Sequence, residues 1–243
     1  MHFKRINLTI GLSFLIFSIG FGQSITARVV TDDELVDVTT KVEAYYHIYE
    51  PVFKASPSMK SMEEAKNIYP EELMISLMSE NSPTWVDYNT WNGTRDKTNN
   101  YYEQKVRWNP EEIYYALTSK FEFKIGNTWY AYMRFRLHGK TVDKPPVGVY
   151  LLRKEKDRWY YTKEVLSNEM NFIFFNFKPE LLEKIFKEEK NGDPALDKLI
   201  DSITINGNIN LKQLEKEVMA AYEAEQKSKS KQFSNYFFEP LNW

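Results

Sequence analysis

Residues 113–137 read IYYALTSKFEFKIGNTWYAYMRFRL, and apolar side chains occupy nearly every odd position of this stretch. Phe121 and Met133 are examples, whereas the even positions are mostly charged or tyrosine. A period of two is what a strand with one buried and one solvated face imposes, because successive side chains point to opposite sides of a sheet. The pattern therefore predicts two antiparallel strands, residues 112–125 and 129–138, with one apolar face that helices must cover.

The turn between these strands is predicted to be a loop of odd length, Gly126-Asn127-Thr128. A two-residue turn would place an apolar residue opposite a polar one at every step of the ladder. A three-residue loop instead pairs Ile125 with Trp129 and keeps both faces of the hairpin uniform.

Further strands are predicted at residues 147–154 and 159–165, separated by a polar turn, and residues 101–108 are predicted to add an edge strand. Before the sheet, a helix is predicted from the Thr31 capping box to Pro51, followed by a short helix at 61–69. Another helix begins at Pro70, because proline suits the first helical turn. Residues 81–100 are predicted to form a long structured loop.

Beyond residue 166 the sequence changes character. Residues 172–177 are predicted to be an aromatic extended segment, and helices follow at 179–190, 194–203 and 211–228. The aromatic C-terminus from Tyr236 to Trp243 is expected to dock on the sheet domain or on a partner. The fold class is therefore α+β: a curved antiparallel sheet packed on N-terminal helices, with a helical C-terminal extension. The chain is expected to divide into an N-terminal segment at 1–22, the α+β domain at 23–166 and the helical extension at 167–243.

The first 22 residues are predicted to be a Sec-type signal peptide. Lys4 and Arg5 precede an uncharged, mostly apolar stretch at 6–21, and cleavage is expected before Gln23. The alternative, a retained anchor, is disfavoured because the stretch is shorter than the roughly 20 residues needed to span a bilayer. We therefore expect a periplasmic or secreted protein with no transmembrane anchor after cleavage.

The chain has no cysteine, which removes disulfides, thiol catalysis, zinc–thiolate sites and the lipoprotein route. Its formal charge is −2, and loss of Lys4 and Arg5 with the signal changes this to −4. A weakly acidic chain with scattered charges gives no reason to expect nucleic acid as a partner.

Two segments carry a family resemblance: WYAYMRFRLHG at 129–139 and VGVYLLRKEKDRW at 147–159. With the helices predicted before them, residues 32–166 resemble the nuclear transport factor two-like superfamily, which includes SnoaL-like and ketosteroid-isomerase-like proteins. The resemblance implies a conical α+β fold whose sheet and helices enclose a pocket. Members range from enzymes to pure binding modules, so the resemblance does not choose an activity.

Motifs for phosphate, zinc, calcium or a nucleophile elbow are absent, and no metal or cofactor is expected. His47 is interpreted as a helix-face residue and His138 as the end of a strand, rather than as bases. The resemblance implies that an enzyme of this kind would use an Asp or His base and a Tyr donor in an apolar cone. Asp87 is the catalytic candidate, and its alternative role is that of a turn or helix-cap residue.

Three aromatic residues are candidates for ligand binding: Trp85, Tyr88 and Trp91. They lie close together in sequence and are interleaved with Asp and Asn side chains, a mixture that suits stacking on a sugar or another planar ligand. The alternative is that these rings are core residues.

Four residues on the even positions form a candidate interface: Tyr130, Tyr132, Arg134 and Arg136. Tyrosine and arginine are enriched in protein interfaces, and a homodimer through the sheet is one expectation. A solvated face, or one covered by the C-terminal helices, is an equal alternative.

The leading functional hypothesis is an exported, non-catalytic binding or accessory protein for a small molecule or glycan in the cell envelope. The alternatives are a lyase, isomerase or hydrolase with an Asp/Tyr pocket, and a protein-interaction scaffold that uses the sheet.

Overall fold

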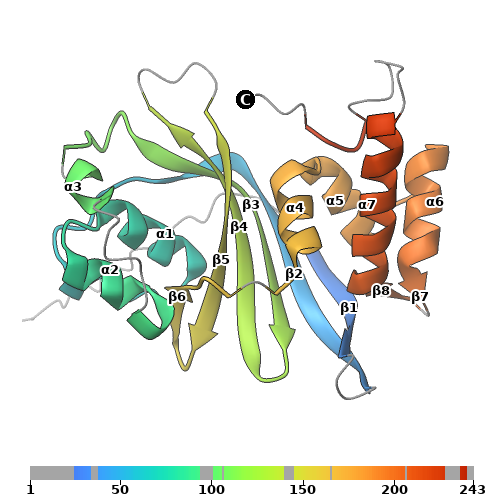
Figure 1. Ribbon diagram of the computed structural model, residues 1–243, viewed down its shortest axis with the longest axis horizontal. Coiled ribbons are helices and arrows are strands. Elements are labelled where there is room, and N and C mark those ends of the chain that lie inside the picture. Colours follow the sequence, from blue (N-terminus) through green and yellow to red (C-terminus); the bar gives the residue numbers. More distant parts are fainter. Residues whose placement is uncertain are drawn as a thin grey trace, which may run out of the picture.

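The protein has three layers, with a twisted sheet between two groups of helices (Figure 1). The computed structural model describes residues 25–33, 38–93, 101–105, 107–139, 145–164, 166–205, 207–227 and 236–239. The sheet has the strand order β6-β5-β4-β3-β2-β1-β8-β7 and is open, with β6 and β7 at its edges. The α+β class is therefore confirmed.

Neighbouring strands are antiparallel throughout the sheet, except that β1 and β8 are parallel. The strands are β1 (Ile25–Asp33), β2 (Val38–Ala55), β3 (Tyr114–Ile125), β4 (Thr128–His138), β5 (Val147–Glu155), β6 (Arg158–Tyr161), β7 (Thr204–Ile205) and β8 (Asn208–Asn210). The predictions for β3, β4, β5 and β6 are confirmed within a few residues.

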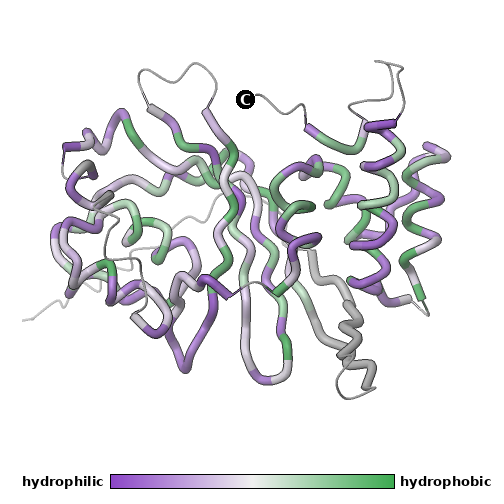
Figure 2. Tube along the Cα trace, viewed as in Figure 1, coloured by the Kyte–Doolittle hydropathy of each residue, from purple (hydrophilic) through white to green (hydrophobic). Residues whose placement is uncertain are grey.

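One helical layer comes from the segment between β2 and β3: α1 (Pro70–Ser79), α2 (Pro83–Asn89) and α3 (Tyr101–Lys105), with the 3₁₀ turns η1 (Met62–Glu64) and η2 (Trp91–Gly93). The other comes from the C-terminal part: α4 (Asn168–Asn176), α5 (Pro179–Phe186), α6 (Pro194–Ile203) and α7 (Leu211–Lys227). In Figure 2, α6 and α7 alternate between hydrophobic and hydrophilic residues, as expected for helices with one buried face.

Each face of the sheet has its own hydrophobic core. On the α1 side, Leu73 and Met74 pack with strand residues such as Leu117 and Met133. On the α4–α7 side, Phe174 packs with strand residues such as Phe121. The prediction of one solvated face is therefore wrong, because helices cover both faces of the central strands.

The hairpin between β3 and β4 also corrects a prediction. Its turn has two residues, with Ile125 paired to Thr128 and Gly126 at a φ of 56°, so the predicted three-residue loop is wrong. The pairing that seemed unfavourable, apolar against polar, carries no penalty here because both faces are buried. The β3–β4 register shifts between Leu117 and Ser119, and this irregularity moves the odd positions of β3 from one core to the other.

Four predicted elements have the wrong type. Residues 31–33 and 38–50, predicted as one helix from the Thr31 capping box, belong to β1 and β2, because a run rich in Val, Thr, Ile and Tyr favours a strand. Residues 101–105, predicted as an edge strand, form α3. Residues 172–176, predicted as extended, belong to α4, since Met170, Ile173 and Phe174 bury one helical face. The predicted loop at 81–100 contains α2 and η2.

The helix starts signalled by proline are confirmed at Pro70, Pro179 and Pro194. At α6 the Asp193 side chain accepts hydrogen bonds from the backbone N–H groups of Ala195 and Leu196, at 2.9 and 3.2 Å. The prolines at the first turn and the Asp193 cap explain why the starts of α5 and α6 were predictable from sequence.

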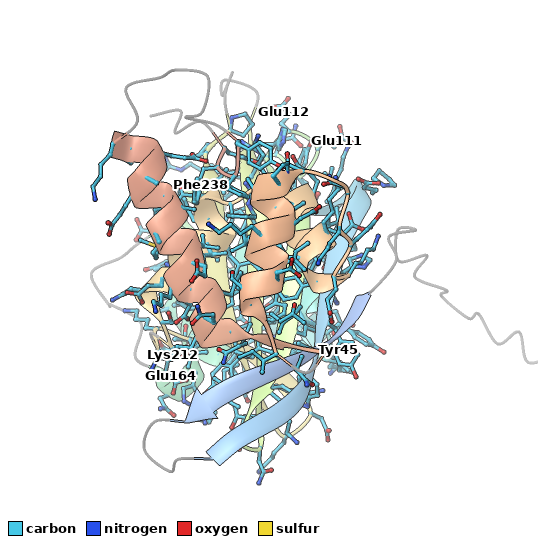
Figure 3. The ribbon with its side chains drawn as sticks, turned by 90° about the vertical axis from the view of Figure 1, so that its right-hand side faces the viewer. Tyr45, Glu111, Glu112, Glu164, Lys212 and Phe238 are labelled. Atoms are coloured by element: carbon cyan, nitrogen blue, oxygen red, sulfur yellow. The ribbon has the colours of Figure 1, made fainter. Side chains whose placement is uncertain are left out.

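The C-terminal residues 236–239 dock on the molecule. Phe237 and Phe238 are buried, and Phe238 forms an isolated antiparallel bridge with Phe177. Figure 3 shows Phe238 near the upper end of the C-terminal helical layer. The prediction that this aromatic segment docks is confirmed for the described residues. In the described part of the chain, no helix combines the length and apolarity that crossing a membrane requires. The predicted signal peptide lies outside the described residues.

Candidate functional site

The α4–α7 side of the sheet carries a stack of alternating rings and guanidinium groups near its β6 edge. We call this stack the aromatic–arginine ladder; its members, in order, are Tyr88, Arg158, Tyr160, Trp91, Arg153 and Tyr130. Most of its side chains are only partly buried. The ladder therefore borders solvent.

The first half of the ladder is built around Arg158. Its guanidinium carbon lies 3.3 Å from the centre of the Tyr88 ring and 4.7 Å from that of Tyr160. One of its terminal nitrogens also donates to the backbone carbonyl of Tyr88, at 2.9 Å. Cation–π attraction at such distances holds the α2 tyrosine against β6.

The second half is built around Arg153. Trp91 meets Tyr160 edge to face at 5.6 Å between ring centres, and the Arg153 guanidinium lies 4.5 Å from the Trp91 ring and 5.8 Å from Tyr130. Both halves thus join at the Trp91–Tyr160 pair.

Glu164 balances the charge of Arg153. Its Oε1 lies 2.7 Å from the Arg153 Nη1, and the Tyr130 hydroxyl donates to Oε2 at 3.3 Å. Partial burial, together with the Glu164 charge, raises the pKa of Tyr130, which keeps this phenol protonated. Arg153, Glu164 and Tyr130 thus form a fixed cluster of hydrogen-bond donors and acceptors.

Strand register explains how three strands contribute to one row. Tyr130 pairs with Arg153 across β4 and β5, and Arg153 pairs with Tyr160 across β5 and β6. Directly paired residues lie on the same face of a sheet, so their side chains meet. Thr90 forms a parallel bridge with Tyr161, which brings Trp91 alongside β6.

A buried polar network fixes α2, the helix that carries Tyr88. The Asn89 side-chain oxygen accepts from the Asn67 amide and the Ser76 hydroxyl, both at 2.9 Å, and its nitrogen donates to Glu80 at 3.1 Å. All four side chains are buried. Buried side chains that hydrogen-bond one another in this way are restrained, so the rings on α2 and η2 are held in place before any ligand arrives.

The three predicted ligand-binding residues separate into two roles. Tyr88 and Trp91 lie in the ladder, whereas Trp85 is a core residue with 1 % exposure whose indole N–H donates to Ser76 at 2.9 Å. The alternative interpretation of Trp85 is therefore the one the structure shows. Asp87 is exposed on α2, where its backbone carbonyl accepts from Thr90.

The four predicted interface residues do not form one exposed surface. Tyr130 belongs to the ladder, Tyr132 is buried against Phe174, and Arg134 and Arg136 form ion pairs with Glu239. Of the alternatives for this face, cover by the C-terminal part of the chain is the one observed.

A cavity of about 200 Å³ opens on the same face as the ladder. Its floor is formed by Tyr132, Val149 and Leu151, and its rim includes Lys163, Glu164 and the residues that begin α4. Tyr132 and Leu151 lie two positions along their strands from Tyr130 and Arg153. The cavity and the ladder are therefore neighbours that share Glu164.

A second polar cluster lies on the α1 side of the sheet. The Lys120 ammonium lies 2.8 Å from Glu71 and 2.7 Å from Glu122, and the Tyr49 hydroxyl donates to Glu71. Burial favours a higher pKa for Glu71, but Lys120 and the hydrogen bonds outweigh it, so this pKa lies below its ordinary value. A carboxylate held in this way is a poor base at neutral pH.

The two histidines in the described part of the chain, His47 and His138, lie in different environments. His47 lies on β2, not on the predicted helix, and burial followed by the nearby Lys120 charge lowers its pKa. His138 ends β4, as predicted, with its ring stacked on Tyr114 at 5.1 Å. Among the described residues, no group of three or more His, Asp or Glu side chains is arranged to hold a metal ion.

Four residues of this site were missed by the sequence analysis: Arg153, Arg158, Tyr160 and Glu164. The sequence contained a signal for two of them, Arg153 and Tyr160. A tight turn at Lys156-Asp157 places Arg153 opposite Tyr160, and the polar turn itself was predicted. The stacking on Tyr88 and Trp91 had no signal, because it depends on how α2 and η2 dock against β6.

No protein-family model, no curated protein and no solved structure matches this chain. The residues of the site must therefore support any functional conclusion themselves.

Proposed function

We propose that this protein is a non-catalytic binding protein for a glycan or a similar small molecule, and that the aromatic–arginine ladder is its binding surface. The observation that carries the proposal is the fixed stack of partly exposed rings interleaved with two guanidinium groups. The ring surfaces that the guanidinium groups leave uncovered bind the apolar face of a sugar, while guanidinium, phenol and carboxylate groups hydrogen-bond its hydroxyls.

The rigid support of the ladder favours binding over a purely structural role. Side chains that are already ordered lose little conformational entropy when a ligand binds. Arg158 and Arg153 order the rings of Tyr88 and Trp91, and the Asn89 network orders the segment beneath them. The site is thus prepared for a ligand that lies along β6.

The catalytic alternative has less support at its predicted residue. This alternative needs a carboxyl group inside an apolar pocket, and Asp87 is exposed on α2. Export to the periplasm or beyond, and the cone-like enclosure implied by the nuclear transport factor two-like resemblance, stay predictions that go with this proposal.

The test is titration with a panel of oligosaccharides, cellohexaose, chitohexaose, xylohexaose and trigalacturonate, followed by isothermal calorimetry. For any member that binds, Trp91→Ala and Tyr160→Ala are each expected to raise the Kd at least tenfold, the loss of one stacking ring. Tyr69→Ala is the control, because Tyr69 is 59 % exposed and outside the ladder. Unfolding temperatures within a few degrees of the parent would show that the variants fold. Equal binding by parent, Trp91→Ala and Tyr160→Ala would contradict the proposal.

A further inference from the structure

The floor of the cavity beside the ladder contains a buried hydroxyl that makes no hydrogen bond with any residue the structure describes. It belongs to Tyr132, which is 2 % exposed and lines the cavity. The other buried tyrosines in the described part of the chain use their hydroxyls in hydrogen bonds within the protein: Tyr46, Tyr49, Tyr115 and Tyr130. Burying a hydroxyl without a partner costs stability, so Tyr132 is a candidate for a role outside folding.

The Tyr132 hydroxyl is held in a fixed position at one end of the cavity. The Tyr132 ring makes near-parallel contacts with Phe123 at 5.8 Å and with Phe174 at 4.9 Å between ring centres. Burial and then the Glu215 charge raise the pKa of the Tyr132 phenol, so the phenol lies near Glu215 and stays protonated. Glu215 interacts in turn with Ser167, which lines the rim. The Tyr132 hydroxyl therefore lies toward the rim formed by the start of α4.

The ionic groups around the cavity carry both signs. Three carboxylates lie at the cavity or in the depression beside it, together with four cationic groups: Glu164, Glu169, Glu215, Arg153, Lys163, Lys212 and Lys216. Arg153 compensates Glu164 at 2.7 Å. Burial and Glu169 raise the pKa of Glu215, and Lys212 opposes this rise. Because positive and negative groups are mixed, the surroundings select neither an anion nor a cation, and an uncharged ligand suits them best.

The rest of the cavity combines an apolar floor with hydrogen-bonding groups at the rim. Val149 and Leu151 supply aliphatic surface, and the side-chain amides of Asn168 and Asn171 line the rim without hydrogen bonds to the described residues. Figure 3 shows Glu164 at the lower end of the helical layer, close to this rim. The volume of about 200 Å³ is below the roughly 300–1,000 Å³ of pockets for drug-sized ligands and suits a single ring. Aliphatic side chains pack on CH groups while amides and a phenol bind hydroxyls, and a sugar ring presents both.

We propose that the cavity is a subsite for one neutral sugar unit at the end of the glycan bound by the ladder, and that the Tyr132 hydroxyl anchors this unit by a hydrogen bond. The sugar ring lies on Val149 and Leu151, and the two asparagines bind its outer hydroxyls. The inference rests on the proposed function, since ladder and cavity are taken as two parts of one binding face. Glu164, which belongs to both, lies where the two units join.

The experiment begins with single sugars, because one unit fills the subsite. The neutral probes are glucose, galactose and mannose, and the charged probes are the uronate and the 2-amino sugar that correspond to each. Kd values come from amide chemical-shift titration. At least one neutral sugar is expected to bind, and neither of its charged relatives is expected to bind more tightly.

Tyr132→Phe removes the hydroxyl and keeps the ring with its stacking contacts. It is expected to raise the Kd of the neutral sugar about fivefold or more, the loss of one hydrogen bond. Because this hydroxyl has no hydrogen-bond partner among the described residues, the same variant is expected to keep the unfolding temperature of the parent or exceed it.

The matched control is Tyr46→Phe. Tyr46 is also buried and in contact with Phe174, but its hydroxyl donates to the Pro179 carbonyl at 3.1 Å. This variant is expected to lower the unfolding temperature and to leave sugar binding intact. The two tyrosines thus give opposite results in the two measurements.

The subsite is overturned if no neutral sugar binds, if a charged relative binds more tightly, or if Tyr132→Phe leaves the Kd unchanged. A fall in unfolding temperature for Tyr132→Phe as large as that for Tyr46→Phe also overturns it, because the hydroxyl then serves the fold. If Trp91-dependent oligosaccharide binding is present but does not depend on Tyr132, this inference alone fails. If that binding is absent as well, the proposed function fails.

Discussion

At the scale of single residues, the most demanding feature is a buried ion pair. The Lys105 ammonium lies 2.9 Å from Glu80, and the two side chains are 3 % and 0 % exposed. Lys105 also donates a hydrogen bond to the Leu77 carbonyl, and the Glu80 carboxylate accepts one from the Asn89 side-chain amide. Burying two charges is tolerated only when each has partners, so this pair ties α3 to the end of α1 and, through Asn89, to α2.

Lys105→Met is therefore expected to lower the free energy of unfolding by about 3–5 kcal/mol, because it leaves the Glu80 carboxylate buried without its cation. Urea denaturation at pH 7 measures this change. The control is Lys187→Met, whose partly exposed i,i+4 pair with Glu183 is expected to contribute less than about 1 kcal/mol. A loss below about 1 kcal/mol for Lys105→Met would show that the pair is not a major support.

Neither member of this pair could be identified from the sequence. Glu80 and Lys105 are 25 residues apart, and α3 was predicted as a strand. The same holds for Arg134, which looked like a solvated residue because its neighbours alternate with apolar ones. Local patterns report whether a side chain is charged, but the partner that permits its burial is set by tertiary packing.

At the scale of elements, an ion pair and a hydrogen bond from the first turn of α1 hold this helix against the sheet. Glu71 reaches Lys120 of β3 at 2.8 Å and accepts the Tyr49 hydroxyl of β2. Since the pKa of Glu71 is lower in the folded protein than its ordinary value of 4.5, the unfolded chain binds this proton more tightly. The stabilisation is thus complete above about pH 4.5 and is lost as the pH falls through the lowered pKa.

Glu71→Gln is expected to lower stability at pH 7 by about 1–2 kcal/mol and to make the unfolding free energy less dependent on pH below 4.5. Denaturant titrations at pH 7, 5 and 3.5 measure both effects. Glu111→Gln is the matched control, because Glu111 is exposed and lies away from this cluster. If parent and Glu71→Gln lost stability equally between pH 5 and 3.5, the role of this contact would be excluded.

Elements were predictable where one local signal fixed them. Proline at the first turn and Asp193 as a cap gave the starts of α1, α5 and α6, and alternation gave β3 and β4. The register of the hairpin was not predictable, because the argument assumed a single buried face. Once both faces are buried, alternation no longer distinguishes inside from outside, and a two-residue turn becomes acceptable.

At the scale of the whole molecule, the C-terminal segment 236–239 connects the end of α4 to strand β4 of the sheet. Glu239, more than 100 positions from β4 in sequence, lies 2.9 Å from Arg134 and also pairs with Arg136. The backbone adds two hydrogen bonds, from Lys178 N to Phe237 O at 2.9 Å and from Glu239 N to Asn176 O at 2.8 Å. Because Arg134 is 1 % exposed, this carboxylate is the main compensation for its buried charge.

Glu239→Gln is therefore expected to destabilise the protein by about 2 kcal/mol, since Arg134 stays buried without a counter-charge. Combining it with Arg134→Met should restore part of the loss, because the double variant removes both charges, and the coupling energy of the cycle should exceed about 1 kcal/mol. Thermal and urea unfolding of the four proteins provide the cycle. Coupling near zero would mean that the pair with Arg134 does not hold the C-terminal segment, which would then depend on Phe237, Phe238 and the two backbone hydrogen bonds. It would also mean that the charge of Arg134 is met by other groups, such as the Thr118 hydroxyl at 3.2 Å.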